Sequence, residues 1–591
     1  MNESLRFEAL PPNTPFRALF LFSRPYVRDY FWGAAAGLFF ICLDLCTPLI
    51  IRAVVERFEA RDITYRFLLL SFALLLVIPV FSGIARYLQR MLIISASRKF
   101  EYDLRNVYYR KIQRLSQDFF HSVKTGDIMA RATNDLNFVR MFVGPGVMNT
   151  LNMIRLPFTL AAMAWLSFKL TAIALIPLPF ISLLVYFFMM YMHRQSRRVQ
   201  EQFSIVTARA QENLAGARVV RAYGIAHHEI RDFRQESEKY MREGLKLTIV
   251  MALAWPLIGA TVGLAALTIL WTGGNMVISE RLSLADLSAF IVYLMMLSWP
   301  LAEFGWVLTL YQRGAVSMTR ILEILTRQPA ISENEHTDRA IASIAGAVSF
   351  RDVSFAYNGQ TVLEDISFDI PAGQTVAVVG PTGSGKSSLL GLIAREYDPR
   401  KGAVMVDGRD IRTLPLNVLR QNIGCVPQDT FLFSDSVKAN LTLGNPEATL
   451  EDMDWACEIA QFSETLEGMP EGYATLLGER GINLSGGQKQ RLTIARALIG
   501  RPRILILDDA LSSVDTHTEE EILRRLKDVM RERTSIIVSH RISTVSHADR
   551  ILVLDEGRIV EEGTHEELIA REGLYANMYR RQLLEEEIEE T

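Results

Sequence analysis

Six long apolar segments before about residue 312 restrict the fold of this chain more than any other feature of its sequence. Each is long enough to cross a bilayer as a helix, which needs about 20 residues, and a helix satisfies its own backbone hydrogen bonds in lipid. Of all residues in the chain, 49% are hydrophobic, and they concentrate in these segments. We therefore expect a six-helix transmembrane domain over residues 29–325, with spans near residues 30–55, 67–88, 143–165, 171–192, 250–278 and 284–310.

The connectors between the spans predict the orientation of this bundle. Three connectors are short, whereas the second and fourth are long and rich in Arg and Lys. Basic residues collect in cytoplasmic loops, so both long connectors, and with six spans both chain termini, are expected on the cytoplasmic side of the membrane. Apolar residues at three- and four-residue spacing over Ala96–Leu115 and Val199–Asn213 predict helices that extend from the spans into the cytoplasm.

Different compositions mark the remaining parts of the chain. Residues 1–28 mix aromatic residues with Arg17 and Arg24, which predicts an interfacial elbow helix, or alternatively a helix packed on the bundle. Residues 326–345 are polar and predict a linker. Residues 346–580 have the composition of an ordinary α/β domain, and residues 581–591 form an acidic tail.

The segment Thr375–Ile393 indicates what this second domain binds. An apolar strand is followed by the pattern G-x-x-x-x-G-K-S and then by an apolar helix, the context that a phosphate-binding P-loop requires. The backbone N–H groups of such a loop cradle phosphates, its Lys reaches the β- and γ-phosphates, and its Ser binds Mg²⁺. The residues expected to bind ATP here are Gly380, Pro381, Thr382, Gly383, Ser384, Gly385, Lys386, Ser387 and Ser388.

Three further strings carry groups suited to a nucleotide site. Asp508 ends the apolar strand Ile504–Leu507, as the Mg²⁺-binding acid of P-loop ATPases does. In Asn483–Arg491, a serine and two glycines open a helix and form a second anion-binding end. His540 follows an apolar strand and could sense the γ-phosphate, with a structural role as the alternative. The net charge of −3 gives no argument for nucleic acid as a partner.

Together these motifs resemble the ATP-binding cassette (ABC) family, and the six preceding spans look like those of an exporter half-transporter. The resemblance implies that Tyr357 stacks on adenine and that Gln428 reaches Mg²⁺ and senses the transmembrane half. It also implies that Ser512 and Asp515 lie in the loop that crosses to the opposite site. The segment Gly478–Gly481 resembles the one that meets the partner's connectors.

The same resemblance implies a dimer. In this family each ATP lies between the P-loop of one chain and the signature of the other, so one copy cannot complete either site. The signature residues expected to meet the ATP of the partner chain are Leu484, Ser485, Gly486, Gly487 and Gln488.

The chain departs from the family pattern at Asp509, where the family usually has the glutamate that polarises the attacking water. The aspartate carboxylate sits back by about 1.5 Å, one C–C bond length. A misplacement of about 1 Å can cost around 10²-fold in rate. Two readings stand: Asp509 works slowly as a base, or the site on this chain's own P-loop mainly holds ATP. The strings LILDDALSSVD and GERGINLSGGQKQR, with EYDLR and TNDLNFVRMFVGPGV upstream, resemble the TmrA-type half of bacterial heterodimeric multidrug exporters. This resemblance favours the second reading and a heterodimer over a homodimer, and it implies a bacterial cytoplasmic (inner) membrane.

The sequence constrains the identity of the substrate less than it constrains the ATP site. Ionisable residues inside spans are functional candidates, which singles out Asp44, Arg155 and Glu303, with structural pairing inside the bundle as the alternative. Arg86 and Arg90 lie beyond one bilayer thickness and are expected to meet water. We expect ATP-driven export of a hydrophobic or amphipathic drug-like compound, lipid or peptide. The alternatives are a homodimeric lipid flippase and an ATP-switched membrane regulator.

Overall fold

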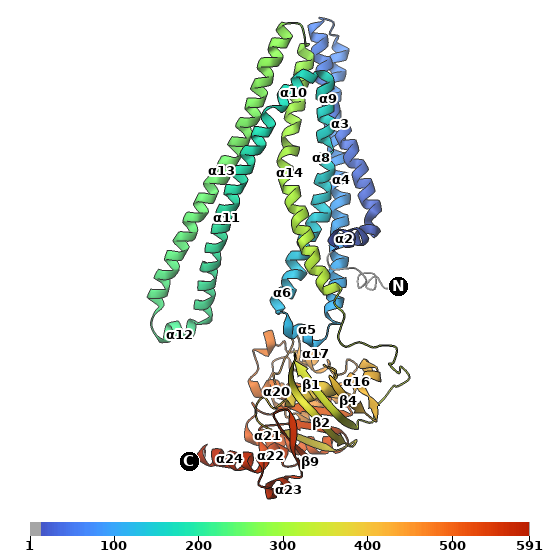
Figure 1. Ribbon diagram of the computed structural model, residues 1–591, viewed down its shortest axis with the longest axis vertical. Coiled ribbons are helices and arrows are strands. Elements are labelled where there is room, and N and C mark those ends of the chain that lie inside the picture. Colours follow the sequence, from blue (N-terminus) through green and yellow to red (C-terminus); the bar gives the residue numbers. More distant parts are fainter. Residues whose placement is uncertain (1–13, 358, 590–591) are drawn as a thin grey trace. The chain divides into compact units, whose positions relative to one another are not determined.

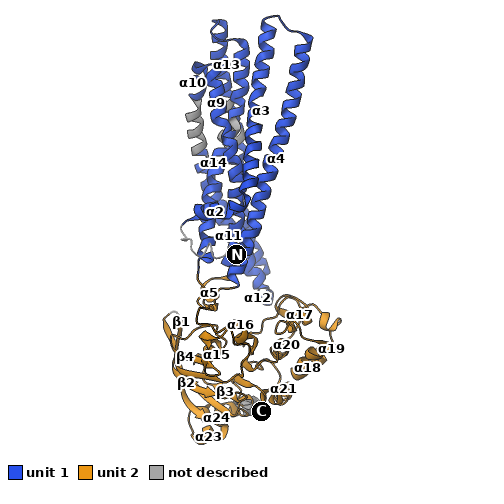
Figure 2. Ribbon diagram, turned by 90° about the vertical axis from the view of Figure 1, so that its right-hand side faces the viewer, with its two compact units in different colours: residues 1–113, 126–327 blue, residues 114–125, 328–591 orange. Residues whose placement is uncertain are grey.

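The computed structural model describes residues 14–357 and 359–589, and it divides the chain into two compact units (Figure 2). Unit 1 comprises residues 1–113 and 126–327, and unit 2 comprises residues 114–125 and 328–591. The first thirteen residues of the predicted elbow segment and the last two of the predicted tail lie outside the described residues.

Unit 1 is built from helices, several of them far longer than a bilayer is thick (Figure 1). They are α2 Pro15–Ser23, η1 Arg24–Tyr26, α3 Val27–Glu59, α4 Tyr65–Ile112, α6 Thr125–Ala130, η2 Arg131–Asp135, α7 Leu136–Met141, η3 Phe142–Gly146, α8 Val147–Met153, α9 Arg155–Leu166, α10 Phe168–Leu175, α11 Pro177–Ala215, α12 Ala217–Ala222, α13 Ala226–Ile278 and α14 Leu284–Leu325.

The predicted spans fall on these helices, and two of the spans are interrupted by a residue outside any helix, at Ile154 and Ile176. Spans one, two, five and six lie within α3, α4, α13 and α14, and span three runs through η3, α8 and α9. Span four is divided between α10 and α11, because Pro177 opens α11 and has no N–H to continue the preceding helix. By length and apolarity, Pro15–Glu59 and Tyr65–Ile112 qualify as membrane spans among the described residues.

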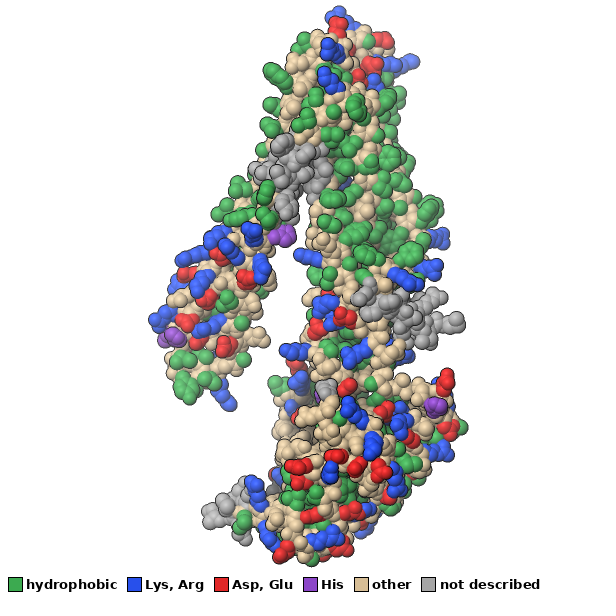
Figure 3. Space-filling model, viewed as in Figure 1, with side chains coloured by type: hydrophobic (Ala, Val, Ile, Leu, Met, Phe, Trp, Pro, Cys, Tyr) green, Lys and Arg blue, Asp and Glu red, His purple; other side chains and the backbone are tan. Residues whose placement is uncertain are grey.

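The long helices continue well past the thickness of a bilayer core. With 53 residues, α13 is about 80 Å long at 1.5 Å per residue. It lies alongside α11, and α12 closes the two into a hairpin (Figure 1). Gln202 Nε2 donates to the Glu236 carboxylate at 2.6 Å, and Arg209 pairs with Asp232 at 2.8 Å. Figure 3 shows charged side chains along the lower half of this hairpin and hydrophobic ones at its α12 tip, whereas hydrophobic side chains dominate the middle of the other helices of unit 1.

An ionic cluster ties the segment after α6 to α14 within unit 1. Asp127 accepts hydrogen bonds from Arg131 at 2.9 Å and from Arg320 at 2.6 Å. Arg320 also pairs with the buried Asp135 at 3.0 Å, and the Ser317 hydroxyl donates to the same carboxylate at 2.8 Å. The cluster pairs Asp135, which would otherwise be a costly buried charge.

Unit 2 contains two sheets with helices packed around them (Figure 1). Its smaller sheet has the order β2-β1-β4-β5 and is antiparallel, with β1 Val348–Tyr357, β2 Gln360–Ile370, β4 Lys401–Val406 and β5 Arg409–Asp410. The larger sheet has the order β10-β9-β3-β8-β7-β6, with β3 Thr375–Val379, β6 Ile423–Val426, β7 Ile504–Asp508, β8 Thr534–Val538, β9 Arg550–Asp555 and β10 Arg558–Gly563.

Several apolar cores lie in unit 2, and the two largest mark its subdomains. One core packs the smaller sheet against β3 and the following helix α15 Lys386–Ile393, with Phe350 and Leu392 fully buried. The other surrounds the helices between β6 and β7 and includes Phe462 and Leu492. Its helices are α17 Val437–Leu441, α18 Leu450–Ile459, α19 Ser463–Glu467 and α20 Gly486–Leu498.

Residues 114–125 differ from the predicted domain limits, which placed them in the transmembrane domain. They group with unit 2, and they contain the short helix α5 Gln117–Ser122, whose Phe119 is 3% exposed. His121 of α5 interacts with Glu396 of unit 2. Burial raises the pKa of Glu396, and the charges of Arg420 and His121 oppose this rise. A turn of six residues has no periodicity that could have assigned it to one domain.

The predicted linker is tied to unit 2 at its end. After α14, the chain has no regular element until β1 begins, but the Asp338 N–H donates to the Thr413 carbonyl oxygen at 2.8 Å. The Asp407 carboxylate accepts hydrogen bonds from the backbone N–H groups of Ala345, Gly346 and Ala347 at 2.6, 3.0 and 2.9 Å. One side chain therefore fixes where β1 starts.

Replacing Asp407 with Ala is expected to lower the free energy of unfolding of unit 2 by about 1.5–3 kcal/mol, because three N–H groups lose a charged acceptor. Hydrogen exchange at Ala345–Ala347 should become faster. Asp407 has a φ of +52°, which Asn tolerates better than most residues, so Asp407→Asn is the matched control and should retain part of the protection. Unchanged exchange in the Ala variant would contradict this account.

Candidate functional site

Four neighbouring strands bring the predicted nucleotide-binding residues to one edge of the larger sheet. β3, β8, β7 and β6 lie in this order and run parallel, so their carboxyl ends meet. The phosphate loop follows Val379, His540 comes two residues after β8, Asp508 ends β7, and Gln428 comes two residues after β6. Ligands of open α/β sheets bind outside this edge.

Glycine is required at both ends of the phosphate loop. Gly380 has a φ of +151°, and a Cβ there would lie 1.9 Å from the Leu554 carbonyl oxygen. Gly385 has a φ of +102°, and a Cβ there would lie 2.7 Å from a methyl group of Leu363. Side chains at these positions would force the loop off the sheet. The loop therefore presents its backbone at the start of α15, where N–H groups are unpaired.

Two polar side chains of the loop are suited to a phosphate group. Lys386 Nζ donates to the carbonyl oxygens of Gly380 and Pro381, both at 2.8 Å. Burial lowers the pKa of Lys386, and the charges of Asp508 and Asp509 oppose this. The buried hydroxyl of Ser384 has no hydrogen-bond partner among the described residues. A bound phosphate would satisfy Ser384 and give Lys386 an anionic acceptor.

Asp508 and Ser387 are the groups that could hold a metal ion. Burial raises the pKa of Asp508, and a hydrogen bond with Ser387 opposes that rise. Among the described residues, no cluster of three or more His, Cys, Asp or Glu side chains could hold a metal without help. A carboxylate and a hydroxyl fit Mg²⁺, which usually keeps water and phosphate oxygens as its other ligands.

Asp509 is held by its backbone. Its N–H donates to the Val538 carbonyl oxygen at 2.8 Å, and its φ is +50°. This left-handed conformation is uncommon outside glycine but enriched for Asp. This hydrogen bond ties the Asp509 backbone to the end of β8, so the length and rotamer of the side chain determine the reach of the carboxylate.

Tyr357 and Ser388 lie close together. The Ser388 hydroxyl donates to the Tyr357 hydroxyl at 3.4 Å, which links the end of β1 to α15. The Tyr357 ring packs edge-on against Phe355 and Tyr397, with centroids 4.7 and 5.2 Å apart. Phe355 and Tyr397 are buried and support the half-buried Tyr357 ring, which is suited to pack against a nucleobase.

The signature residues open α20 with a reciprocal cap. The Ser485 hydroxyl accepts from the Gln488 N–H at 3.3 Å, and the Gln488 side chain accepts from the Ser485 N–H at 2.9 Å. Leu484 is 8% exposed and packs in the second core of unit 2, whereas Ser485 and Gly486 are exposed. The start of α20 thus presents an anion-binding helix end to the surface of the cassette.

Sequence reasoning missed Gln490, which connects the signature helix to the predicted crossing loop. Gln490 is 3% exposed; its amide N–H donates to the Ser512 hydroxyl at 2.9 Å, and its carbonyl oxygen accepts from the Ser513 N–H at 2.8 Å. Asp515 ends this loop and caps α21 Thr516–Met530 by accepting from the Thr518 N–H at 3.0 Å. The helical period of α20 could have suggested an inward-facing Gln490, but not its partners.

Glu519 was also missed, because nothing in the sequence near it marks a site. It is 3% exposed, and it accepts hydrogen bonds from Arg541 and from the Thr544 hydroxyl, the latter at 2.6 Å. Arg541 directly follows His540 in the chain. Glu519 therefore holds the segment after His540 against α21.

The candidate substrate residues separate into two groups. Arg155 and Asp44 form an ion pair at 2.9 Å, so these two charges satisfy each other inside unit 1. Glu303 instead lines a cavity together with Arg86 and Arg90.

Comparisons with known families cover most of the chain. Residues 34–301 match the ABC transporter transmembrane region, and residues 363–512 match the ABC transporter family of ATP-binding domains. A solved structure of a bacterial Atm1-family ABC exporter with ATP bound has a TM-score of 0.76 and 26% identity. The alignment covers 94% of this chain and 98% of that one.

Curated relatives match over nearly the whole length. The multidrug resistance-like ATP-binding protein MdlA of Escherichia coli (strain K12) is 33% identical over 96% of this chain and 97% of its own. An ATP-dependent lipid A-core flippase of Syntrophus aciditrophicus is 35% identical over 87% of this chain and 86% of its own. The predicted fold class, a helical transmembrane region followed by an α/β cassette, is confirmed. The chain belongs to the ABC transporter family, as an exporter with fused transmembrane and ATP-binding domains whose ATP hydrolysis is coupled to transport.

Proposed function

We propose that this chain is one half of a heterodimeric exporter that moves a hydrophobic or amphipathic compound out of the cytoplasm, with both of its own termini on the cytoplasmic side. The observation that carries the export function is the gathering of the phosphate loop, Asp508, Gln428 and His540 at one sheet edge. Relatives named for multidrug resistance and for lipid flipping support the class of cargo.

Each group at this edge has a role in the proposed cycle. Lys386 and the loop N–H groups bind the phosphates, and Tyr357 packs on the adenine. Ser387, Asp508 and Gln428 would hold Mg²⁺, which when bound neutralises charge that develops on the transferred phosphoryl group. His540 would contact the γ-phosphate and so distinguish the bound triphosphate from the diphosphate.

The opening and closing of the dimer would follow from the difference in ATP affinity between its open and closed states. The exposed start of α20 supports a second chain that completes the site, because each chain offers both a phosphate loop and a signature. ATP that binds the closed pair more tightly than the open pair shifts the population towards closure. The membrane helices, continuous with the cytoplasmic ones, would carry that change to the cargo.

The heterodimer proposal rests on Asp509. Its backbone is fixed by Val538, so the missing methylene leaves the carboxylate short of an attacking water. The site on this chain's phosphate loop would then hold ATP and turn over slowly. The signature of this chain is intact and would complete a fully active site on the phosphate loop of the partner chain.

An ATPase measurement on the chain alone and with a neighbouring six-span ABC half tests this. We expect the chain alone to hydrolyse ATP slowly, because one copy completes neither site. In the assembled pair, Asp509→Glu should raise turnover at the site on this chain's phosphate loop by about ten- to a hundredfold, since it restores the reach of the carboxylate. Asp509→Asn should change the slow rate little. Full turnover by the solitary chain that Asp509→Asn abolishes would sink the heterodimer proposal.

The tip of the α11–α13 hairpin is proposed to contact a cassette of the second chain. All six residues of α12 are exposed or half-buried, and Val219 and Tyr223 are 55% and 76% exposed. Apolar side chains this exposed at the end of a charged hairpin favour a protein partner.

Val219→Asp is expected to reduce ATP-driven dye uptake into inside-out vesicles at least tenfold while ATP still binds, because a charge would enter an apolar contact. Val219→Ile is the matched control and should transport normally. Normal uptake by the Asp variant would contradict this contact. No ATP-driven uptake of any dye by the assembled wild-type protein would favour the regulator alternative.

A lipid flippase remains the second candidate, on the evidence of one relative. It predicts ATPase activity that lipid stimulates in the chain alone, without a partner half. The heterodimer proposal predicts stimulation only when the partner is present.

A further inference from the structure

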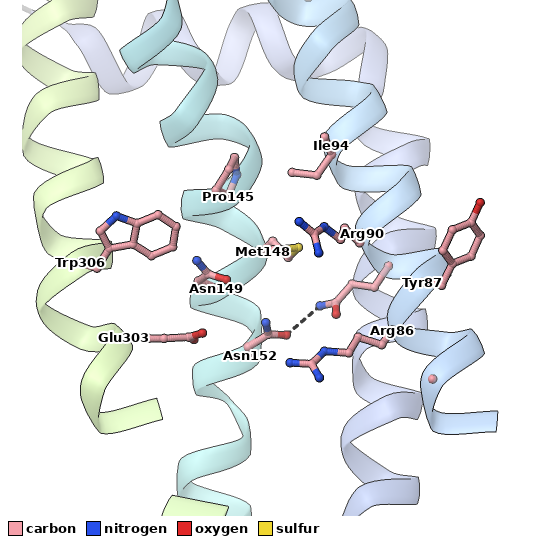
Figure 4. Close-up of a pocket in the computed structure, with 12 residues that line it drawn as sticks. Arg86, Tyr87, Arg90, Ile94, Pro145, Met148, Asn149, Asn152, Glu303 and Trp306 are labelled. Atoms are coloured by element: carbon pink, nitrogen blue, oxygen red, sulfur yellow. Dashed lines mark hydrogen bonds between the residues drawn. The ribbon is translucent and has the colours of Figure 1, made fainter. Parts of the chain in front are cut away.

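We propose that unit 1 contains a binding site for amphipathic anions, in a cavity of about 680 Å³ lined by α4, α8, α14 and the turn η3 (Figure 4). The volume is typical of sites for small ligands, which occupy about 300–1,000 Å³. The inference rests on the proposed function, because it names the chemical class of compound that the exporter would carry.

The lining has an excess of positive charge. Arg86 and Arg90 lie one turn apart on α4, both are exposed, and Figure 4 shows their guanidinium groups directed towards α8. The acid that lines the cavity is Glu303, opposite on α14. Two cations and one anion leave a net charge of +1 among the lining residues.

The neighbouring charges do not cancel this excess. Arg155 and Asp44 neutralise each other in their 2.9 Å ion pair. The Arg86 guanidinium lies over the Phe40 ring, 5.3 Å from its centroid, which leaves its charge in place. Arg90 forms no ion pair or hydrogen bond among the described residues. Both arginines are exposed in unit 1, so their charges are available to an anion that enters the cavity.

Polar and apolar groups face the same space. Asn152 accepts a hydrogen bond from the Gln89 side chain at 3.1 Å, which leaves its own N–H donors available. Asn149 is 4% exposed and lies beside it on α8. Trp306 extends from α14 towards these amides, and Met148 lies near Arg90 (Figure 4). The two cations and the amides lie on α4 and α8, and Trp306 lies across from them on α14 beside Glu303, so the cavity offers donors to an anionic head and aromatic surface to an apolar tail.

This arrangement disfavours lipophilic cations. A cation could meet Glu303 and the face of Trp306, but it would also meet two guanidinium groups. Alkyl phosphates and alkyl carboxylates carry the matching charge, whether they come from a membrane lipid or from a free single-chain amphiphile.

Equilibrium binding of radiolabelled dodecyl phosphate to the full-length protein in neutral detergent, without ATP, tests the inference. We expect Arg86→Gln and Arg90→Gln each to weaken binding about tenfold, as loss of a charge-assisted hydrogen bond would, and Arg90→Lys to retain most of the affinity. Glu303→Gln should tighten binding, an effect that damage to the fold would not produce. Arg66→Gln, in the first turn of the same helix and outside the cavity, is the matched control.

Competing probes distinguish the contribution of the charged head from that of the apolar tail. They also distinguish a membrane lipid from a free amphiphile as the source of the anion. Dodecyltrimethylammonium has the same tail and should not displace dodecyl phosphate from the cavity. Displacement by dioleoylphosphatidic acid would support a lipid source, and displacement only by single-chain phosphates would support a free amphiphile. Equal affinity in the Arg86→Gln and Arg90→Gln variants, or preferred binding of the ammonium probe, would overturn the inference.

The binding and uptake measurements distinguish a failure of the anion site from a failure of the export proposal. Charge-selective binding without ATP-driven uptake would contradict export and leave the anion site standing. Uptake that ignores the charge of the cargo would contradict the anion site alone.

Discussion

The parallel pairing of β3, β8, β7 and β6 is the constraint on which the rest of the site depends. It places four short segments, distant in sequence, at one edge, and the apolar side chains of these strands fix their register. Gly380 and Gly385 then allow the loop to approach the sheet more closely than any side chain would permit. The chemistry of ATP binding therefore follows from sheet order before any single polar residue is considered.

The second constraint is that the signature belongs to a different subdomain. Gln490 joins the signature helix to the loop of Ser512, and Glu519 joins the following helix to the segment after His540. These buried amide and carboxylate contacts link the signature helix, which would meet the partner's ATP, to the segments that would meet the ATP on this chain's own phosphate loop. Movement at one site would be felt at the other through a few hydrogen bonds.

Much of the architecture could be predicted because it depends on local pattern. Apolar length predicts the spans, and the spacing of Gly380, Gly385 and Lys386 predicts the phosphate loop. The break before Pro177 and the grouping of α5 with unit 2 could not be assigned, since span length alone does not locate a break and a six-residue helix has no period. The Asp44–Arg155 pair, the cavity at Arg86 and the partners of Gln490 depend on tertiary packing, which spacing along the chain does not encode.

The central claim is that this polypeptide supplies half of a clamp that ATP closes. The most direct measurement is the mass of the purified protein in lipid nanodiscs, with and without ATP and Mg²⁺, alone and with a second ABC half. The account predicts particles that contain two six-span chains. A particle with one chain, at saturating ATP and Mg²⁺ and with every candidate companion present, would contradict it.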